Sequence, residues 1–314
     1  MTAAPSTLRS PREMLETELV TRSMGGELRL RVASAIDDGA RAERDLRRVA
    51  ARVEAWAGRL TRFSEASDLS ALNADPAASI VCVRPTLGAV LSHAQSMKTR
   101  TEGTVDITML DERIAAESDD RVDHGPRSTW GHQRLGRLHV LTRNGPVRFD
   151  LDGVAKGWVA DRALRLLDGY PSACVDADGD VAVRAAADSG WHVALEDPRD
   201  HEAELGSVRV PRGWPAGRYG VATSGTSVHR WAGRSGATHH LIDPLTGRSA
   251  VTDVMQATVI AEDAATAECL AKAAVIRGSR EGLELVGRAG AWAALMVLED
   301  GELVTTPGTS RWLA

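Results

Sequence analysis

The stretch from Phe149 to Gly157, FDLDGVAKG, places carboxylates, a lysine and glycines directly before an amphipathic helix. Glycine lets the backbone approach a ligand closely, and the free N–H groups at a helix N-terminus favour anions such as phosphate. Lys156 would add positive charge there, and Asp150 and Asp152 would add hydrogen-bond acceptors for a sugar, a ring or a metal. Aspartate and glycine before a helix are also ordinary turn and cap residues. The stretch is therefore a candidate anion or nucleotide site, with a plain helix start as the alternative.

Similar polar segments recur along the chain, at the ends of expected strands and helices. Between them they supply glycine, hydroxyl, carboxylate, ammonium and imidazole groups. Any one of them alone has an ordinary explanation as a turn, but together they favour a functional site. The segments are Met24–Gly26, Thr104–Asp106, Asp150–Lys156, Asp178–Asp180, Thr223–Gly225 and His240–Gly247.

The apolar pattern predicts the elements that would carry these segments. Helices are expected at 37–60, 85–101, 158–167, 264–276 and 279–289, and strands at 19–20, 28–32, 138–142, 147–150, 173–176, 181–183, 191–195, 206–210, 254–261 and 292–298. The strands at 138–142 and 147–150 would form a hairpin. Loops are expected at 63–73, 220–225 and 239–247, with a long surface excursion at 111–136. Many short strands with helices laid against them predict an α+β fold rather than a doubly wound parallel sheet.

The composition argues against several classes of protein. A formal charge of −5 is spread along 314 residues that are only 4% aromatic, which disfavours nucleic-acid binding. The widely spaced Cys82, Cys174 and Cys269 fit neither a disulfide framework nor a zinc motif, and we expect them to be reduced and buried. No stretch resembles a signal peptide or a membrane span. We therefore expect a cytoplasmic protein without membrane insertion, made of a loose leader at 1–15 and one domain at 16–314.

In order and spacing, the polar segments resemble the ApbE family of FAD:protein FMN transferases. The most specific pieces are Thr223-Ser-Gly225 and His240-Leu-Ile-Asp-Pro-Leu-Thr-Gly247, which are similar to the family's T-S-G and H-x-I-D-P-x-T-G signatures. The stretch 149–157 is similar to its D-L-x-G-x-A-K-G segment, and 67–73 to its S-x-L-S-x-L-N segment. The likeness runs from about residue 24 to about residue 298. It implies an ApbE-like T-fold with antiparallel sheets backed by helices, in a single catalytic domain of two intertwined halves with FAD in a central cleft.

The resemblance also implies a reaction and the groups that perform it. FAD is split at its pyrophosphate, the FMN half is attached to a Ser or Thr of a flavin-acceptor protein, AMP leaves, and Mg²⁺ assists. His240 is implied as the base or as a ligand of the pyrophosphate, and Lys156 as a catalytic cation. The implied FAD contacts are Met24, Phe63, Thr104, Val105, Asp106, Asp150, Lys156 and Thr223.

The implied metal site departs from the family pattern. Family members bind magnesium through a backbone carbonyl of the D-L-x-G turn, here Gly153, and through an Asp and a Thr one helical turn apart. The matching residues are Glu268 and Lys272, which would share one helix face. An ammonium cannot ligate a cation. Either Lys272 places its charge where the metal's charge would be, or Glu268 and Lys272 form an ordinary ion pair beside a metal site that has been lost. We expect magnesium dependence to be reduced or absent.

Two other functions would use the same scaffold. One is a non-catalytic flavin-binding protein, and the other is a hydrolase that converts FAD to FMN and AMP. In addition, Ser235-Gly-Ala-Thr238 resembles the core of the family's acceptor sequence, although Ala232 stands where an acidic residue is usual. Attachment of FMN to Ser235 is thus an alternative to a plain surface loop.

Overall fold

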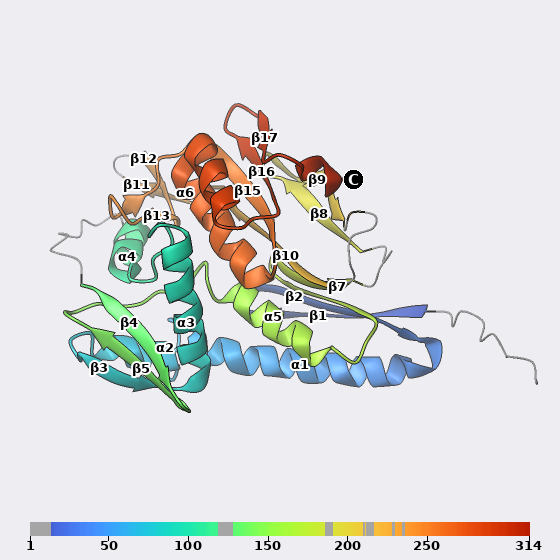
Figure 1. Ribbon diagram of the computed structural model, residues 1–314, viewed down its shortest axis with the longest axis horizontal. Helices are drawn as coiled ribbons and strands as arrows, with labels where there is room; N and C mark the ends of the chain where they lie inside the picture. Colours follow the sequence, from blue (N-terminus) through green and yellow to red (C-terminus); the bar gives the residue numbers. More distant parts are fainter. Residues whose placement is uncertain are drawn as a thin grey trace, which may run out of the picture.

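An antiparallel sheet of eight strands forms the centre of the molecule (Figure 1). Its strand order is β1-β2-β6-β7-β10-β15-β16-β17, and every neighbouring pair is antiparallel. Apolar residues point to both faces: Val175 and Ala182 join the core under the helices, and Cys174 and Val183 join a core on the opposite face. The strands are β1 Met14–Ser23, β2 Gly26–Ala35, β6 Ser172–Ala177, β7 Asp180–Ala185, β10 Gly217–Gly225, β15 Val254–Ala261, β16 Ala293–Leu298 and β17 Leu303–Thr305.

The structure is a computed structural model that describes residues 14–118, 128–185, 191–209, 211, 217–227, 230–233 and 236–314. Of the expected leader, residues 1–13 lie outside these ranges, while Met14 and Leu15 belong to β1. Ser235, the candidate acceptor, also lies outside them. Among the described helices, none combines the length and the apolar character needed to cross a membrane.

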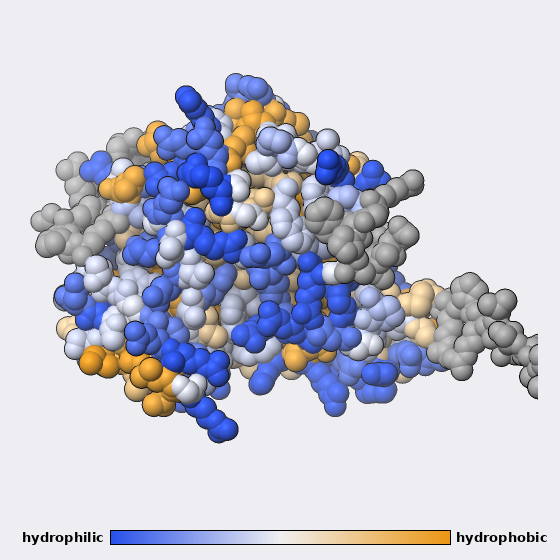
Figure 2. Space-filling model, viewed as in Figure 1, coloured by the Kyte–Doolittle hydropathy of each residue, from blue (hydrophilic) through white to orange (hydrophobic). Residues whose placement is uncertain are grey.

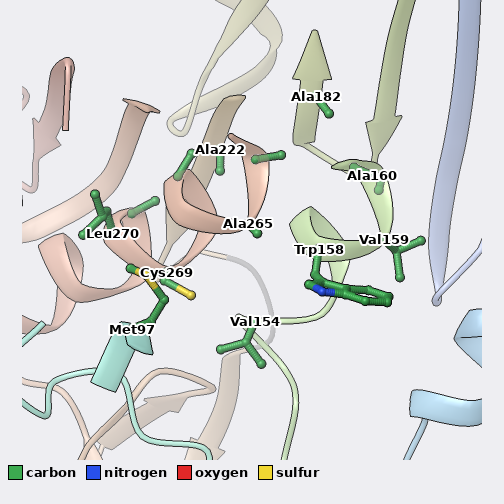
Figure 3. Close-up of a cluster of buried hydrophobic side chains, with 14 of the residues drawn as sticks. Met97, Val154, Trp158, Val159, Ala160, Ala182, Ala222, Ala265, Cys269 and Leu270 are labelled. Carbon is green, nitrogen blue, oxygen red and sulfur yellow. The ribbon is translucent and has the colours of Figure 1, made fainter. Parts of the chain in front are cut away.

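Three helices cover one face of the large sheet (Figure 1). Their predicted positions were correct to within a few residues, and the break expected near residue 278 is a kink at Gly278, whose φ is 78°. Met97, Val154 and Cys269 lie in the apolar cluster that joins these helices to the rest of the molecule (Figure 3). The helices are α1 Gly39–Leu60, α5 Lys156–Leu166 and α6 Ala264–Arg288.

Glycines allow the start of α6 to touch both α5 and β10. A Cβ atom on Gly220 would lie 2.1 Å from the Ala264 nitrogen, and one on Gly157 would lie 2.4 Å from the Ala264 carbonyl oxygen. No larger residue fits at such separations without moving backbone. The two glycines therefore set the spacing between α6 and its neighbours.

The N-termini of α5 and α6 are capped by each other's carboxylates. Asp161 of α5 accepts hydrogen bonds from the backbone N–H groups of Ala264 (3.1 Å) and Ala265 (2.9 Å). In return, Oε2 of Glu268 on α6 accepts from the backbone N–H of Gly157 (3.0 Å). Each carboxylate satisfies N–H groups that a helix start leaves without an intrahelical partner. The two helices thus share their caps.

Asp161 is expected to give the stability of the protein a pH dependence. Burial and the nearby Asp263 raise the pKa of Asp161 from 3.8 to about 7. Between those two values the folded chain holds a proton that the unfolded chain has released, so stability falls as the pH rises through this window. Asp161→Asn, which resembles the protonated form, should remove this part of the decline, worth about 1.4 kcal/mol for each pKa unit. Urea unfolding of both chains at about pH 5 and about pH 8 measures it. An identical pH difference in the two chains would contradict the assignment.

The opposite face of the sheet is covered by a hairpin and the C-terminus. The hairpin consists of β8 His192–Asp197 and β9 Asp200–Arg209. Trp312 packs against Trp292 and Tyr219 in the second core, and its carbonyl oxygen accepts from the backbone N–H of Arg209 at 2.8 Å. A single turn of 3₁₀ helix at Thr309–Arg311 leads into this contact, and another at Ile36–Asp38 precedes α1.

A smaller layer of helices and strands lies beside α1 (Figure 1). Its sheet has the order β3-β5-β4 and exposes Ile80, Leu135 and Leu138. Figure 2 shows an orange area at the lower left, over this part of the molecule. Cys82 on β3 is exposed, so the prediction that all three cysteines are buried was wrong at this position. The elements are α2 Asp68–Ala74, α3 Pro85–Arg100, α4 Leu110–Ser118, β3 Ile80–Val83, β4 Trp130–Leu135 and β5 Leu138–Arg143.

The predicted hairpin at 138–142 and 147–150 was wrong. β5 pairs with β4 instead, around a turn at Gly136, whose φ of 62° suits glycine. The backbone N–H groups of Val147 and Asp150 donate to the carbonyl oxygens of Pro76 (3.2 Å) and Ile107 (2.7 Å). These backbone N–H groups therefore bond to loops, and the segment does not pair with β5 as a strand.

Two stretches expected as loops contain helices. Ser67 caps α2 within the stretch 63–73, and the apolar stripe of α2 consists only of Leu69 and Leu72. α4 begins at the start of the predicted surface excursion and buries Arg113 with its apolar residues. A two-residue stripe and a buried arginine leave no readable helical period.

Strands occupy β10 and much of the segment that follows it. The stretch 220–225, expected as a loop, is the end of β10 and pairs with β15. The expected turn at Asp243–Gly247 is present: the Asp243 carbonyl oxygen accepts from the N–H of Gly247 at 2.8 Å. The remaining strands are β11 Arg230–Gly233, β12 Gly236–His239, β13 Ile242–Asp243 and β14 Arg248–Ser249.

Candidate functional site

A cleft of about 470 Å³ lies where the start of α5, the ends of β7 and β10, and α6 converge. A small recess adjoins it and shares Asp152, His240 and Lys272 with it. Five of the six polar segments recognised in the sequence meet here, although they are far apart along the chain, and Met24–Gly26 lines neither cavity. Nine of the implied site residues line the cleft or the recess: Thr104, Asp106, Asp150, Gly153, Lys156, Thr223, His240, Glu268 and Lys272.

Three implied FAD contacts lie away from both cavities. Val105 is buried in the main core. Met24, with a φ of 53°, occupies the turn between β1 and β2 and packs against that core. Phe63 is 82% exposed, with the Arg62 guanidinium 4.3 Å from the centre of its ring. A role for these residues in binding a flavin stays a prediction.

Lys156 is the first residue of α5 and supplies positive charge to the cleft. Its Nζ lies 3.0 Å from Oδ2 of Asp178. Burial disfavours the charged ammonium, but the carboxylates of Asp180 and Asp178 outweigh it and raise the pKa of Lys156 above its usual value. The side chain is therefore a permanent cation beside a helix N-terminus, an arrangement suited to phosphate.

The buried Arg113 joins the two walls of the recess. Its Nη1 donates to Oδ2 of Asp152 (3.0 Å) and to the backbone carbonyl of His240 (2.9 Å), and its Nε donates to Oε1 of Glu117 (2.8 Å). Its guanidinium lies 5.4 Å from the ring centre of Trp231. Arg113 was not among the predicted site residues, since it lies in the polar stretch that showed no period.

The pKa values of the carboxyl groups of the site are shifted in different directions. Burial would raise the pKa of Asp152, but the charges of Lys272 and Arg113 hold it below its usual range. Burial and the charge of Asp152 raise the pKa of Asp150. Burial and the nearby Glu268 raise the pKa of Asp180 well above its usual value. Of these three carboxyl groups, Asp152 is therefore the one most strongly favoured as a charged carboxylate.

The two side chains of α6 at the expected metal-ligand positions both bind protein groups. Lys272 Nζ donates to the backbone carbonyl of Asp152 at 2.9 Å, and Glu268 caps α5 through Gly157. Burial raises the pKa of Glu268 to about 7, partly offset by that hydrogen bond. Across the described ranges, no group of three or more His, Cys, Asp or Glu residues is arranged to hold a metal. These residues do not fit Mg²⁺, which prefers oxygen ligands in octahedral geometry.

Adjacent histidines occupy different environments. His239 is buried; its Nδ1 accepts from the N–H of Leu241 at 3.3 Å, so its Nε2, 3.0 Å from the carbonyl oxygen of Ala250, must donate. His240 lines both the cleft and the recess. His239 is thus a structural group with a fixed tautomer, and His240 is the histidine that lines the two cavities.

Thr223 is held at the end of β10 by the neighbouring strand. Its Oγ1 lies 2.9 Å from Oγ1 of Thr258 on β15, and the two residues are paired in the sheet. The T-S-G segment therefore reaches the cleft on a sheet strand, and a strand holds a side chain more rigidly than a loop does.

Asn73 fixes the start of the turn that carries Asp150 and Asp152. Its side-chain amide donates to the carbonyl of Phe149 and accepts from the N–H of Phe149, both at 2.8 Å. The asparagine at the end of the S-x-L-S-x-L-N segment thus has a physical role in this chain: α2 carries the amide that positions the turn.

Asn73→Leu should destabilise the fold by about 2 kcal/mol, because it leaves the N–H and carbonyl of Phe149 without their partner. The measurement is the free energy of unfolding in urea. Asn144→Ala is the matched control, since that exposed side chain accepts one bond, from the N–H of Thr129; its cost should stay below about 1 kcal/mol. Equal losses in the two variants would contradict the positioning role of Asn73.

A model of the ApbE family matches residues 24–296. The FAD:protein FMN transferase of Salmonella typhimurium is 28% identical over 193 residues, which cover 57% of this chain and 52% of that protein. The protein of the same name from Escherichia coli K12 is 26% identical over 269 residues, covering 79% of this chain and 72% of the relative. The match to this chain thus covers about half the length of the Salmonella relative.

Solved structures share the fold. An ApbE protein from Thermotoga maritima superposes with a TM-score of 0.78 at 24% identity, covering 96% of this chain and all of that one (100%). The flavin transferase ApbE from Vibrio cholerae superposes with a TM-score of 0.73 at 22% identity, with coverage of 96% and 100%. The expected fold, antiparallel sheets backed by helices, is confirmed.

Proposed function

The chain belongs to the ApbE family, and from this premise we propose that it is a flavin transferase that uses FAD as donor and attaches FMN to a Ser or Thr of a target protein, releasing AMP. The observation that carries the proposal is the convergence of Lys156, Arg113, Lys272 and His240 on one cleft and its recess. Three cations suit a pyrophosphate, and an imidazole beside them suits the removal of a proton from a hydroxyl. Curated relatives that match this chain carry the name FAD:protein FMN transferase.

In the proposed reaction, the acceptor hydroxyl oxygen attacks the phosphorus on the flavin side of the pyrophosphate. A new P–O bond forms, and the bond from that phosphorus to the bridging oxygen breaks. AMP leaves with the electron pair of the broken bond. His240 takes the proton of the acceptor, and Lys156 with the N-terminus of α5 stabilises the charge on the phosphate oxygens. The flavin contacts implied by the family resemblance remain part of this proposal.

The test is to incubate the protein with FAD and a peptide that carries Asp three residues before a Thr-Gly-Ala-Thr core. We expect AMP in equal amount to peptide whose mass has risen by one FMN unit. Release of AMP and free FMN with no modified peptide would replace the transferase by a hydrolase. Bound FAD without any AMP would replace it by a flavin carrier. The intact mass of the protein in the same samples shows whether the chain modifies itself, as at Ser235.

We also assign this activity to the cytoplasm. The supporting observation is that Cys82, Cys174 and Cys269 are all free, as expected in a reducing compartment. Fractionation of cells that produce the protein, followed by detection of the chain, would test the assignment. Recovery outside the cytoplasm would overturn it.

A further inference from the structure

The side chain of Lys272 fills the place next to Gly153 where the resemblance puts a metal ion. Its aliphatic part lies over the glycine so closely that a Cβ atom on Gly153 would be 2.6 Å from Lys272 Cδ and 2.9 Å from Nζ. Gly153 has a φ of 82° and no side chain, and both properties make the space that the lysine occupies. The glycine and the lysine therefore fit each other.

The ammonium group of Lys272 is fixed at a point where it faces both cavities. Its hydrogen bond to the backbone carbonyl of Asp152 tethers it at 2.9 Å, and the residue lines both the cleft and the recess. One N–H bond is used by this carbonyl, so an ammonium retains further donors for a ligand. The cation is thus preorganised before any ligand enters.

The other expected metal ligands have assigned partners. Oε2 of Glu268 accepts from the N–H of Gly157 at 3.0 Å, so Glu268 and Lys272 bind different groups rather than each other. The carbonyl oxygen of Gly153 lies 3.5 Å from the thiol sulfur of Cys269, which donates to it. A divalent ion placed here would lie beside a fixed ammonium and would meet strong repulsion.

We propose that Lys272 is the resident cation of the pyrophosphate site, and that this chain binds and uses FAD without a divalent metal. The inference rests on the proposed function, because it takes the pyrophosphate of FAD as the ligand. Lys272 Nζ contributes a positive charge and N–H donors to the phosphate oxygens, and Lys156 contributes the same from the start of α5. Both charges are parts of the protein, so neither depends on the metal concentration of the solution.

The experiment measures the dissociation constant of FAD by the quenching of its fluorescence, in the presence of either EDTA or Mg²⁺. For the unmodified chain we expect the two constants to agree within about threefold. Lys272→Met keeps an unbranched apolar side chain only one atom shorter and removes the charge, and should weaken binding roughly ten- to hundredfold in both conditions. If Lys272→Met fails to fold, Lys272→Gln gives the same comparison.

A double variant tests the exchange of a lysine for a metal directly. Glu268→Asp with Lys272→Thr introduces the residue types that the resemblance implies for magnesium. It should bind FAD weakly in EDTA and at least about tenfold more tightly in Mg²⁺. Arg280→Met is the control for loss of positive charge from the same helix, since Arg280 is 90% exposed and its ion-pair partner is Glu284; its FAD affinity should equal that of the unmodified chain.

The outcomes separate this inference from the proposed function. FAD binding and FMN transfer that both require Mg²⁺ in the unmodified chain would overturn the role of Lys272 and leave the transferase intact. Unchanged FAD affinity in Lys272→Met would also overturn it. Tight FAD binding in EDTA that is lost in Lys272→Met, together with no AMP release, would support Lys272 as the resident cation for binding and overturn the transferase.

Discussion

Replacing His240 with asparagine is expected to lower the rate of FMN transfer about 10²- to 10⁴-fold. Asparagine is close to histidine in volume and can donate a hydrogen bond, but it does not accept a proton at neutral pH. The backbone carbonyl of His240 would still accept from Arg113, so the recess should keep its shape. The measurement is the formation of FMN-modified peptide with FAD and peptide in excess.

The affinity for FAD separates the two roles that the sequence left open for His240. If it is the base, His240→Asn leaves the dissociation constant of FAD nearly unchanged while the rate falls. If it is a pyrophosphate ligand, the affinity falls along with the rate. His192→Asn is the control, since His192 is an exposed histidine of β8. A full transfer rate in His240→Asn would remove this residue from the reaction.

Gly220→Val is expected to cost about 3 kcal/mol or more of folding stability. The first added atom would lie 2.1 Å from the Ala264 nitrogen and 2.2 Å from the Asp263 carbonyl carbon, so relief requires movement of backbone rather than of a flexible side chain. Separation of α6 from β10 would also displace Lys272 and Thr223. If the variant is soluble, urea unfolding measures its loss of stability. If the loss of stability is larger, we expect to recover the chain in the insoluble fraction.

The matched control is a glycine with open space around it. Gly58 lies inside α1, and a Cβ atom there would have no neighbour within 4 Å. Gly58→Ala should therefore raise stability by roughly 0.5–1 kcal/mol through better helix propensity. A similar loss in both variants would mean that the close contact at Gly220 does not limit stability.

Long elements with a regular apolar period could be predicted from the sequence. α1 buries Ala42, Leu46, Val49 and Val53 at helical spacing, so its position was readable. β4 was missed because its alternation is poor and because Asn144-Gly145 offered a more familiar hairpin turn. The turn that forms is at Gly136 instead. Local turn chemistry was outweighed by hydrogen bonds to the loops at Pro76 and Ile107.

Some residues of the candidate site could likewise be predicted from the sequence, and others could not. Residues within recognisable motifs, such as Lys156 and His240, could be found because the motif fixes their position. Arg113 could not, because its partners Asp152 and Glu117 are 39 and 4 positions away and only the folded chain brings all three together. The mutual capping of α5 and α6 was equally unreadable, since Asp161 and Glu268 look like ordinary polar residues of helices.

That mutual capping also bears on amide hydrogen exchange. The first N–H groups of a helix usually exchange with water through local fraying. Here the amides of Gly157, Ala264 and Ala265 are bonded to carboxylates that belong to the other helix. We expect their protons to exchange with water only when α5 and α6 separate, so that the two helix starts exchange as one cooperative unit. Lys156 belongs to that unit, so a ligand bound to Lys156 would slow the exchange of all three amides together.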